Sequence, residues 1–223
     1  MIGSRGPTPL ERGRWIARLL HRSWDVGAEA APVSPEELTA IAPAILSTGC
    51  AGLAWRALER TPLRDSPAAL EFRAAYRMEV LQAAVREREI VEVLQRLRDR
   101  SVEPLLVKGW SIARLYPGKG LRPYGDIDLY ALASRAMHEA AIRDVVATSF
   151  RVEVHQKHNF PFDRTVDALF EHSEWATLGE TPVRLSSPED HLRLVCLHLL
   201  YHGAWRPLCG LKYSNGSRHS RQR

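Results

Sequence analysis

Cysteine is scarce in this chain, with three residues in 223 (Cys50, Cys196 and Cys209), none of them in a CxxC spacing. So few, scattered and odd in number, they argue against a disulfide framework and against a thiolate zinc site. Long apolar runs are also missing, since no stretch approaches the ~18 to 20 residues of a membrane span. The first seven residues contain no apolar region of the secretory type. These absences predict a cytoplasmic protein in a reducing compartment, with no membrane partner.

The chain before residue 203 has no excess of positive charge. The whole sequence has 31 basic and 26 acidic residues and a formal net charge of +5. From residue 203 onward no acid occurs, and the five basic residues there are Arg206, Lys212, Arg218, Arg221 and Arg223. Subtracting these five from 31 leaves 26 basic residues against 26 acidic ones. A neutral body does not support nucleic acid as a partner, so RNA binding through the tail is only a minor hypothesis.

Composition and hydrophobic periodicity divide the chain into four segments. We expect an N-terminal helical region (1–100), a core (101–186), a C-terminal helix packing on the core (187–208) and a disordered basic tail (209–223). The composition changes abruptly after Pro207-Leu208, which suggests truncation or an altered reading frame relative to a longer ancestral chain.

The N-terminal region carries clear helix signals. Ser34-Pro35-Glu36-Glu37 has an N-cap, a proline at the first helical position and a capping-box glutamate, and Ser66-Pro67 opens a longer helix. An apolar stripe in that longer helix is expected to be packing surface. Its members are Leu70, Ala74, Met78, Leu81, Val85, Val91 and Leu94.

The pattern after Ser101 predicts a mixed α+β fold with a small sheet. The expected strands are Pro104–Val107, a strand carrying Asp126, Arg151–His155 and Pro182–Leu185; the expected helices are Trp110–Leu115, Ser134–Ala147 and Pro188–His202. Alternation in the third strand places Arg151, Glu153 and His155 on one face.

The acidic pair in Gly125-Asp126-Ile127-Asp128-Leu129 is the most informative feature of the sequence. Residues two apart in a strand project from the same face, so both carboxylates would stand side by side. Two such charges ~4 Å apart repel by about 4 kcal/mol at an effective dielectric near 20. A shared proton or a cation must relieve this repulsion, and oxygen ligands of this kind suit Mg²⁺.

The ordered string of motifs around this pair resembles the polymerase-β-like nucleotidyltransferases, and above all the family of uncharacterised bacterial nucleotidyltransferases. The resemblance covers roughly residues 70 to 208 and includes Lys108-Gly109, Leu115-Tyr116, Arg122 and Asp126-Ile127-Asp128-Leu129. Similar segments follow at Val152-Glu153-Val154-His155, at Ser187-Pro188-Glu189-Asp190-His191-Leu192, and at Cys196-Leu197-His198 with His202.

The resemblance implies an enzyme that transfers a nucleoside monophosphate from an NTP to an acceptor hydroxyl or phosphate and releases pyrophosphate. Asp126 and Asp128 would bind one or two Mg²⁺ (or Mn²⁺) ions, and Gly109 and Ser111 would hold phosphate oxygens. Trp110 departs from the family pattern, which more often has Ser or Gly directly after the first glycine. Lys108 and Arg122 would neutralise phosphate charge or form structural ion pairs.

Several alternatives remain open at this stage. The third metal-binding carboxylate is expected to be Glu153, with Asp167 as the alternative and Asp163 as a weaker one, because the segment between Leu129 and Val152 is short. The histidines at 191, 198 and 202 fit a structural or pocket role better than a zinc site. The acceptor could be a small molecule, a peptide, a protein or RNA. The rival to an enzyme is a degenerate family member that binds a nucleotide or a partner protein without catalysis.

Overall fold

The computed structural model describes residues 6–24, 31–132, 136–147, 151–155 and 163–200. Within these ranges the chain folds into α-helices, one 3₁₀ helix (η1) and a five-stranded sheet, which confirms the predicted α+β class. The N-terminal elements are α1 (Pro9–Arg22), α2 (Pro35–Ser47), α3 (Ala51–Leu58), η1 (Pro62–Asp65) and α4 (Pro67–Arg98). The remaining elements are β1 (Pro104–Val107), α5 (Gly109–Ala113), β2 (Ile127–Ala131), α6 (Ala136–Ala147), β3 (Val152–His155), α7 (Val166–Glu171), β4 (Glu174–Leu178), β5 (Thr181–Leu185) and α8 (Pro188–Leu199).

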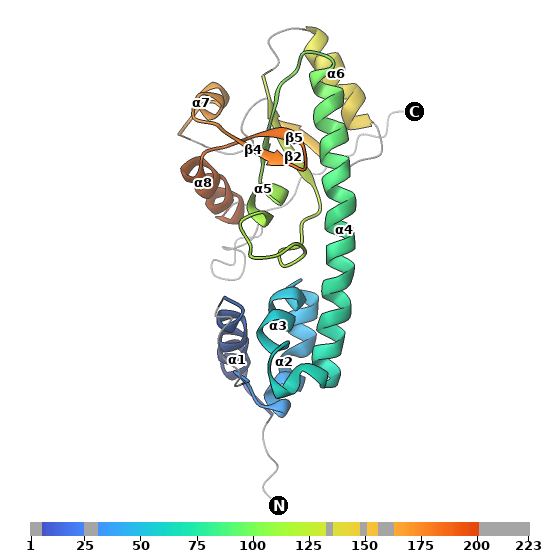
Figure 1. Cartoon of the computed structure of the whole chain (residues 1–223). Helices are drawn as coiled ribbons and strands as arrows, with labels where there is room; N and C mark the ends of the chain where they lie inside the picture. The colour runs from blue at the N-terminus through green and yellow to red at the C-terminus, as the bar shows by residue number, and fades with distance from the viewer. Residues whose placement is uncertain (1–5, 25–30, 133–135, 148–150, 156–162, 201–223) are drawn as a thin grey trace, which may run out of the picture.

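The predicted helix starts in the N-terminal region are confirmed. Ser34 and Glu37 form a reciprocal capping box at the start of α2, and the Ser66 side chain accepts the backbone N–H of Ala69 at the start of α4. The α1–α4 helices share one apolar core, which includes Leu38, Ile41 and Phe72. Figure 1 shows α4 continuing past this core to the sheet, so one helix contributes to both parts of the molecule.

The sheet has the strand order β3-β2-β1-β5-β4. β1 pairs antiparallel with β2 and parallel with β5, while β2 pairs parallel with β3. A parallel pair needs a crossover connection, and α6 provides it between β2 and β3. The short segment that follows Leu129 therefore suffices to bring β3 directly alongside β2.

Alternation along the strands divides the core into two layers of contacts. Leu106, Ile127 and Leu129 belong to a cluster with apolar residues of α4 and α6 on one face of the sheet. Leu105 and Tyr130 pack with residues of α7 and α8 on the other face. Figure 1 shows the two helix pairs on opposite sides of the strands. Asp128 has the strand parity of Tyr130 and so belongs to the α7/α8 face.

The prediction that the apolar stripe on α4 is packing surface is wrong for its first five members. Leu70, Met78, Leu81 and Val85 are 45–63% exposed, and Ala74 is exposed as well. The helix instead turns a neighbouring face toward the loop that precedes β2. Gly120 in that loop has φ +80° and approaches Val80 so closely that an added Cβ would lie 2.7 Å from Val80 Cγ2. This close contact lies on a face of α4 that the apolar spacing did not reveal.

Other expectations hold with small shifts of boundary. β2 begins at Ile127, so Asp126 precedes the strand, and α5 spans Gly109–Ala113 rather than Trp110–Leu115. The sequence analysis did not predict β4 or α7 as separate elements. The predicted helix end at His202 and the predicted tail 209–223 lie outside the described residues. Among the described helices, none is long and apolar enough to cross a membrane.

Candidate active site

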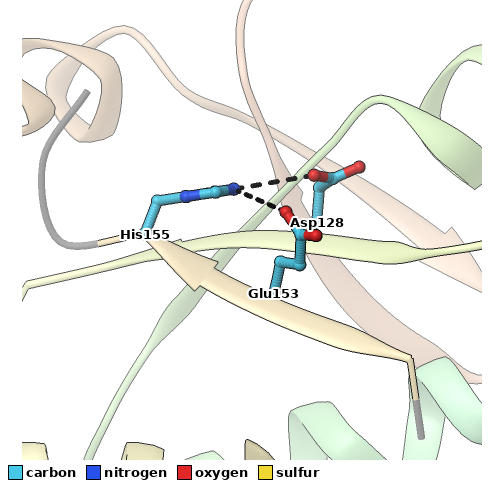
Figure 2. A group of neighbouring side chains, drawn as sticks. All are labelled: Asp128, Glu153 and His155. Carbon is cyan, nitrogen blue, oxygen red and sulfur yellow. Dashed lines mark ion pairs between the residues drawn. The ribbon is translucent and has the colours of Figure 1, made fainter. Parts of the chain in front are cut away.

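The register of β2 and β3 assembles a compact group of metal-ligand side chains. Asp128 pairs with Glu153 and Tyr130 with His155 across the parallel ladder, so these four side chains share one face. One ligand atom from each of Asp128, Glu153 and His155 lies within 4.8 Å of the other two. Figure 2 shows the three side chains converging from the two strands. Two carboxylates and an imidazole at this spacing can hold one divalent cation.

Basic groups surround the Asp128 carboxylate. Lys108 Nζ lies 2.9 Å from Asp128 Oδ1, and His155 Nε2 lies 3.6 Å from the same oxygen and 3.6 Å from Glu153 Oε2. Burial raises the pKa of Asp128, but the interactions with His155 and Lys108 outweigh it and hold the pKa below its usual value. Asp128 is therefore a buried, ionised carboxylate. Burial and the neighbouring Asp128 charge raise the pKa of Tyr130 to about 12.

Asp126 lies differently from its predicted position beside Asp128 on the strand. It precedes β2, its side chain is exposed, and it does not belong to the group of three described above. Both aspartates nevertheless line the same cavity. The inner carboxylate is thus fixed by the sheet, whereas the outer one stands at the rim. The metal-binding roles assigned to Asp126, Asp128 and Glu153 from the sequence stay predictions.

A strained turn after β1 lines the same cavity beside the acidic residues. Lys108 has φ +53°, a conformation that costs free energy for a residue with a side chain, and Gly109 follows with φ +34°. A Cβ at Gly109 would lie 3.2 Å from the carbonyl oxygen of Asp126, so glycine allows the turn to lie close to the chain entering β2. The turn brings backbone next to the acidic group.

His191 of α8 stabilises this turn through hydrogen bonds. The backbone N–H of Lys108 donates to His191 Nε2 at 2.8 Å, and Ser111 Oγ lies 3.2 Å from the same nitrogen. The Ser111 hydroxyl also donates to the carbonyl of Lys108. Ser111 is buried and is not among the residues that line the cavity, and its phosphate contact stays a prediction. Its hydrogen bonds instead stabilise the turn.

The electrostatic state of His191 follows from these contacts. An imidazole nitrogen that accepts a hydrogen bond is unprotonated, so the ring is neutral with its proton on Nδ1. Burial and the charges of Arg122 and Arg114 lower the pKa of His191 to about 4. Sequence reasoning placed this residue among pocket or structural histidines and missed its specific contact. Its position in the first turns of a helix that begins after Ser187 could be predicted, but its partner, 83 residues away, could not.

Asp190 anchors that helix and was also missed. Its side chain is completely buried and lies 2.9 Å from Arg164 Nε and 3.1 Å from Arg193 Nη1. Ser187 Oγ donates to its other carboxylate oxygen at 3.1 Å. These contacts fix the start of α8 and therefore the position of His191.

The cavity lined by the acidic group and the turn has a volume of about 450 Å³. Arg122, from the loop before β2, lines it and donates to the carbonyl of Gly109 at 3.2 Å. The full lining is Lys108, Gly109, Ile112, Arg122, Pro123, Tyr124, Gly125, Asp126, Asp128, Tyr130, Glu153, His155, Val195 and His198. The alternative ligands Asp163 and Asp167 are exposed and are not part of this lining.

Comparison with known proteins gives one family. The model of a family described as uncharacterised nucleotidyltransferase matches residues 34–214, which is most of the chain and includes every residue of the cavity. The match also extends further toward the N-terminus than the resemblance noted from the motifs. No curated protein matches the chain. No solved structure matches it either.

Proposed function

Because the chain belongs to the family of uncharacterised nucleotidyltransferases, we propose that it transfers a nucleoside monophosphate from an NTP to an acceptor hydroxyl or phosphate and releases pyrophosphate. The observation that carries this proposal is the convergence of Asp128, Glu153 and His155 in a cavity that the Lys108-Gly109 turn also lines. A metal-ligand group facing a glycine turn and an arginine matches what phosphoryl transfer requires. We further propose that residues 101–186 form a polymerase-β-like core.

The donor set fits a divalent cation. Asp128 and Glu153 supply carboxylate oxygens, and His155 supplies a nitrogen within the same 4.8 Å group. Oxygen ligands suit Mg²⁺, whereas an imidazole is better accepted by Mn²⁺. When bound, such an ion neutralises charge on the phosphates and favours departure of pyrophosphate. Asp126, at the rim, would bind the same cation together with the incoming triphosphate.

The remaining residues bind and orient the nucleotide. Lys108 and Arg122 neutralise phosphate charge, and the Gly109 backbone lets the triphosphate lie close to the turn. Arg122 is held by its hydrogen bond to the Gly109 carbonyl, so its guanidinium is oriented before the nucleotide enters. Tyr124 and Tyr130 offer aromatic surface in the same cavity. Glu153, the most exposed of the three metal-ligand groups, is placed to accept the proton of an attacking hydroxyl.

The test is a titration of Mg²⁺ and Mn²⁺ with each NTP, followed by calorimetry and by release of pyrophosphate. The wild-type protein is compared with Asp128→Asn and Glu153→Gln, which keep side-chain volume while removing charge. Metal-dependent NTP binding that is lost in Asp128→Asn is expected. Equal binding and turnover in wild type and Asp128→Asn would refute the proposal.

One observation favours a second function. Lys108 forms an ion pair with Asp128, so a cation of the chain itself already neutralises the inner carboxylate. A family member that binds an NTP through Lys108 and Arg122 without transferring it would use the same arrangement. NTP binding that does not depend on a divalent metal, with no release of pyrophosphate, would identify this case.

A further inference from the structure

Lys108 is a cation built into the acidic end of the cavity. Its Nζ lies 2.9 Å from Asp128 Oδ1, and the side chains of the two residues are 19% and 11% exposed. His155 Nε2 approaches the same oxygen at 3.6 Å. The ammonium group of Lys108 therefore already neutralises the charge of the inner carboxylate. A divalent cation that binds Asp128 must compete with the ammonium group for this oxygen.

The backbone of Lys108 is fixed, but its side chain is not. Its N–H is held by His191 and its φ of +53° is set by the turn, so the Cα has one position. Four rotatable bonds separate that Cα from the ammonium group, which lines the same cavity as Gly109 and Arg122. Rotation about these bonds can move the ammonium from the carboxylate toward the turn without any change in the backbone.

The two possible partners of Lys108 differ in when they are present. Asp128 is always there, whereas triphosphate oxygens are present only when an NTP occupies the cavity. An NTP offers the ammonium several anionic oxygens and so draws it away from Asp128. The carboxylate group is then left with an excess of negative charge, which favours a divalent cation. Binding of the nucleotide and binding of the metal are thus coupled, and by linkage the coupling is reciprocal.

We propose that the ion pair between Lys108 and Asp128 prevents a divalent metal from binding Asp128 until a nucleotide is present. Triphosphate oxygens then take the place of Asp128 as partners of the ammonium group, and the carboxylate becomes available to the metal. This inference rests on the proposed nucleotidyl transfer, and it adds an order of binding: the nucleotide-free protein binds divalent metal weakly. Lys108 acts here as a positioning residue, and its consequence is measurable without turnover.

The test measures Mn²⁺ binding by electron paramagnetic resonance, with and without the four α,β-methylene analogues of ATP, GTP, CTP and UTP. Lys108→Met removes the ammonium and keeps the unbranched chain except for its last atom. Lys108→Arg keeps the charge. Lys119→Met is the matched control, since Lys119 forms an ion pair with Glu87 at 2.5 Å outside the cavity.

Without nucleotide, Lys108→Met is expected to bind Mn²⁺ at least about tenfold more tightly than wild type, because the competing charge is gone. Lys108→Arg and Lys119→Met should bind as weakly as wild type. An analogue should tighten Mn²⁺ binding to wild type about tenfold or more, and should do so much less in Lys108→Met.

Two results would overturn the inference, and they have different meanings. Equal Mn²⁺ affinities in nucleotide-free wild type and Lys108→Met, with an analogue still increasing binding in both, would exclude the role of Lys108 and leave the proposed function intact. No Mn²⁺ binding in any variant, with or without an analogue, would overturn both. Thermal unfolding of each variant shows whether a substitution impairs folding. If Lys108→Met has a folding defect, the role of the charge is judged from wild type and Lys108→Arg, with and without an analogue.

Discussion

Protonation of His191 should destabilise the folded protein, and the expected loss in free energy of unfolding follows from the structure. The ring is buried against the Lys108 turn, and burial together with the charges of Arg122 and Arg114 lowers its pKa to about 4 from its ordinary value of 6.5. Because the folded pKa lies below the unfolded one, the unfolded chain takes up the proton first. Stability is therefore complete above the unfolded pKa and is lost as the pH falls through 6.5 toward 4. At pH 4.5 the expected loss is about 2.5 kcal/mol.

The matched variant is His191→Gln, whose amide oxygen can still accept the N–H of Lys108 but does not titrate. Urea unfolding at pH 7.5 and pH 4.5 measures the free energy of unfolding of each protein. Carboxylates that titrate in this interval affect both proteins alike, so the difference between them isolates His191. Wild type should lose about 2.5 kcal/mol more than the variant. Equal losses in the two proteins would refute the assignment of a neutral, hydrogen-bonded ring.

Three further changes test other parts of the structure. Asp190→Asn removes a buried charge from two arginines and should lower the free energy of unfolding by about 3 kcal/mol, measured in urea. Gly120→Ala should cost about 1 to 3 kcal/mol, because the new Cβ would lie 2.7 Å from a valine of α4 at a φ of +80°. Gly125→Ala is its control, since a Cβ there meets nothing within 4 Å, and an equal loss in both would contradict the packing described. Glu153→Gln should weaken Mn²⁺ binding in the presence of an NTP analogue at least about tenfold. Asp167→Asn should leave it unchanged, and the reverse result would transfer the third-ligand role to the residue on α7.

Local signals in the sequence predicted much of the fold. Ser34, Ser66 and Ser187 each start a helix as expected, because a side-chain cap acts within three residues of itself. The alternation of residues 151–155 predicted that Glu153 and His155 share a face, and the structure confirms this. Such features depend on neighbours along the chain, so one sequence suffices to read them.

Contacts between distant segments could not be predicted in this way. The hydrogen bond from Lys108 to His191 joins residues 83 positions apart, and nothing in either local pattern specifies it. The exposed stripe on α4 has the same cause, since the face that this helix buries depends on distant partners, among them Gly120 in the loop before β2. Asp126 was expected beside Asp128 because strand parity was extended one residue too far.

We propose above all that Asp128 is the inner ligand of a metal-dependent nucleotide site. The most direct test is NTP binding and pyrophosphate release measured with Mn²⁺ in wild type and Asp128→Asn, at equal protein concentration and with folding verified. The account predicts metal-dependent binding and release in wild type and neither in the variant. Metal-dependent release that persists in Asp128→Asn would contradict it.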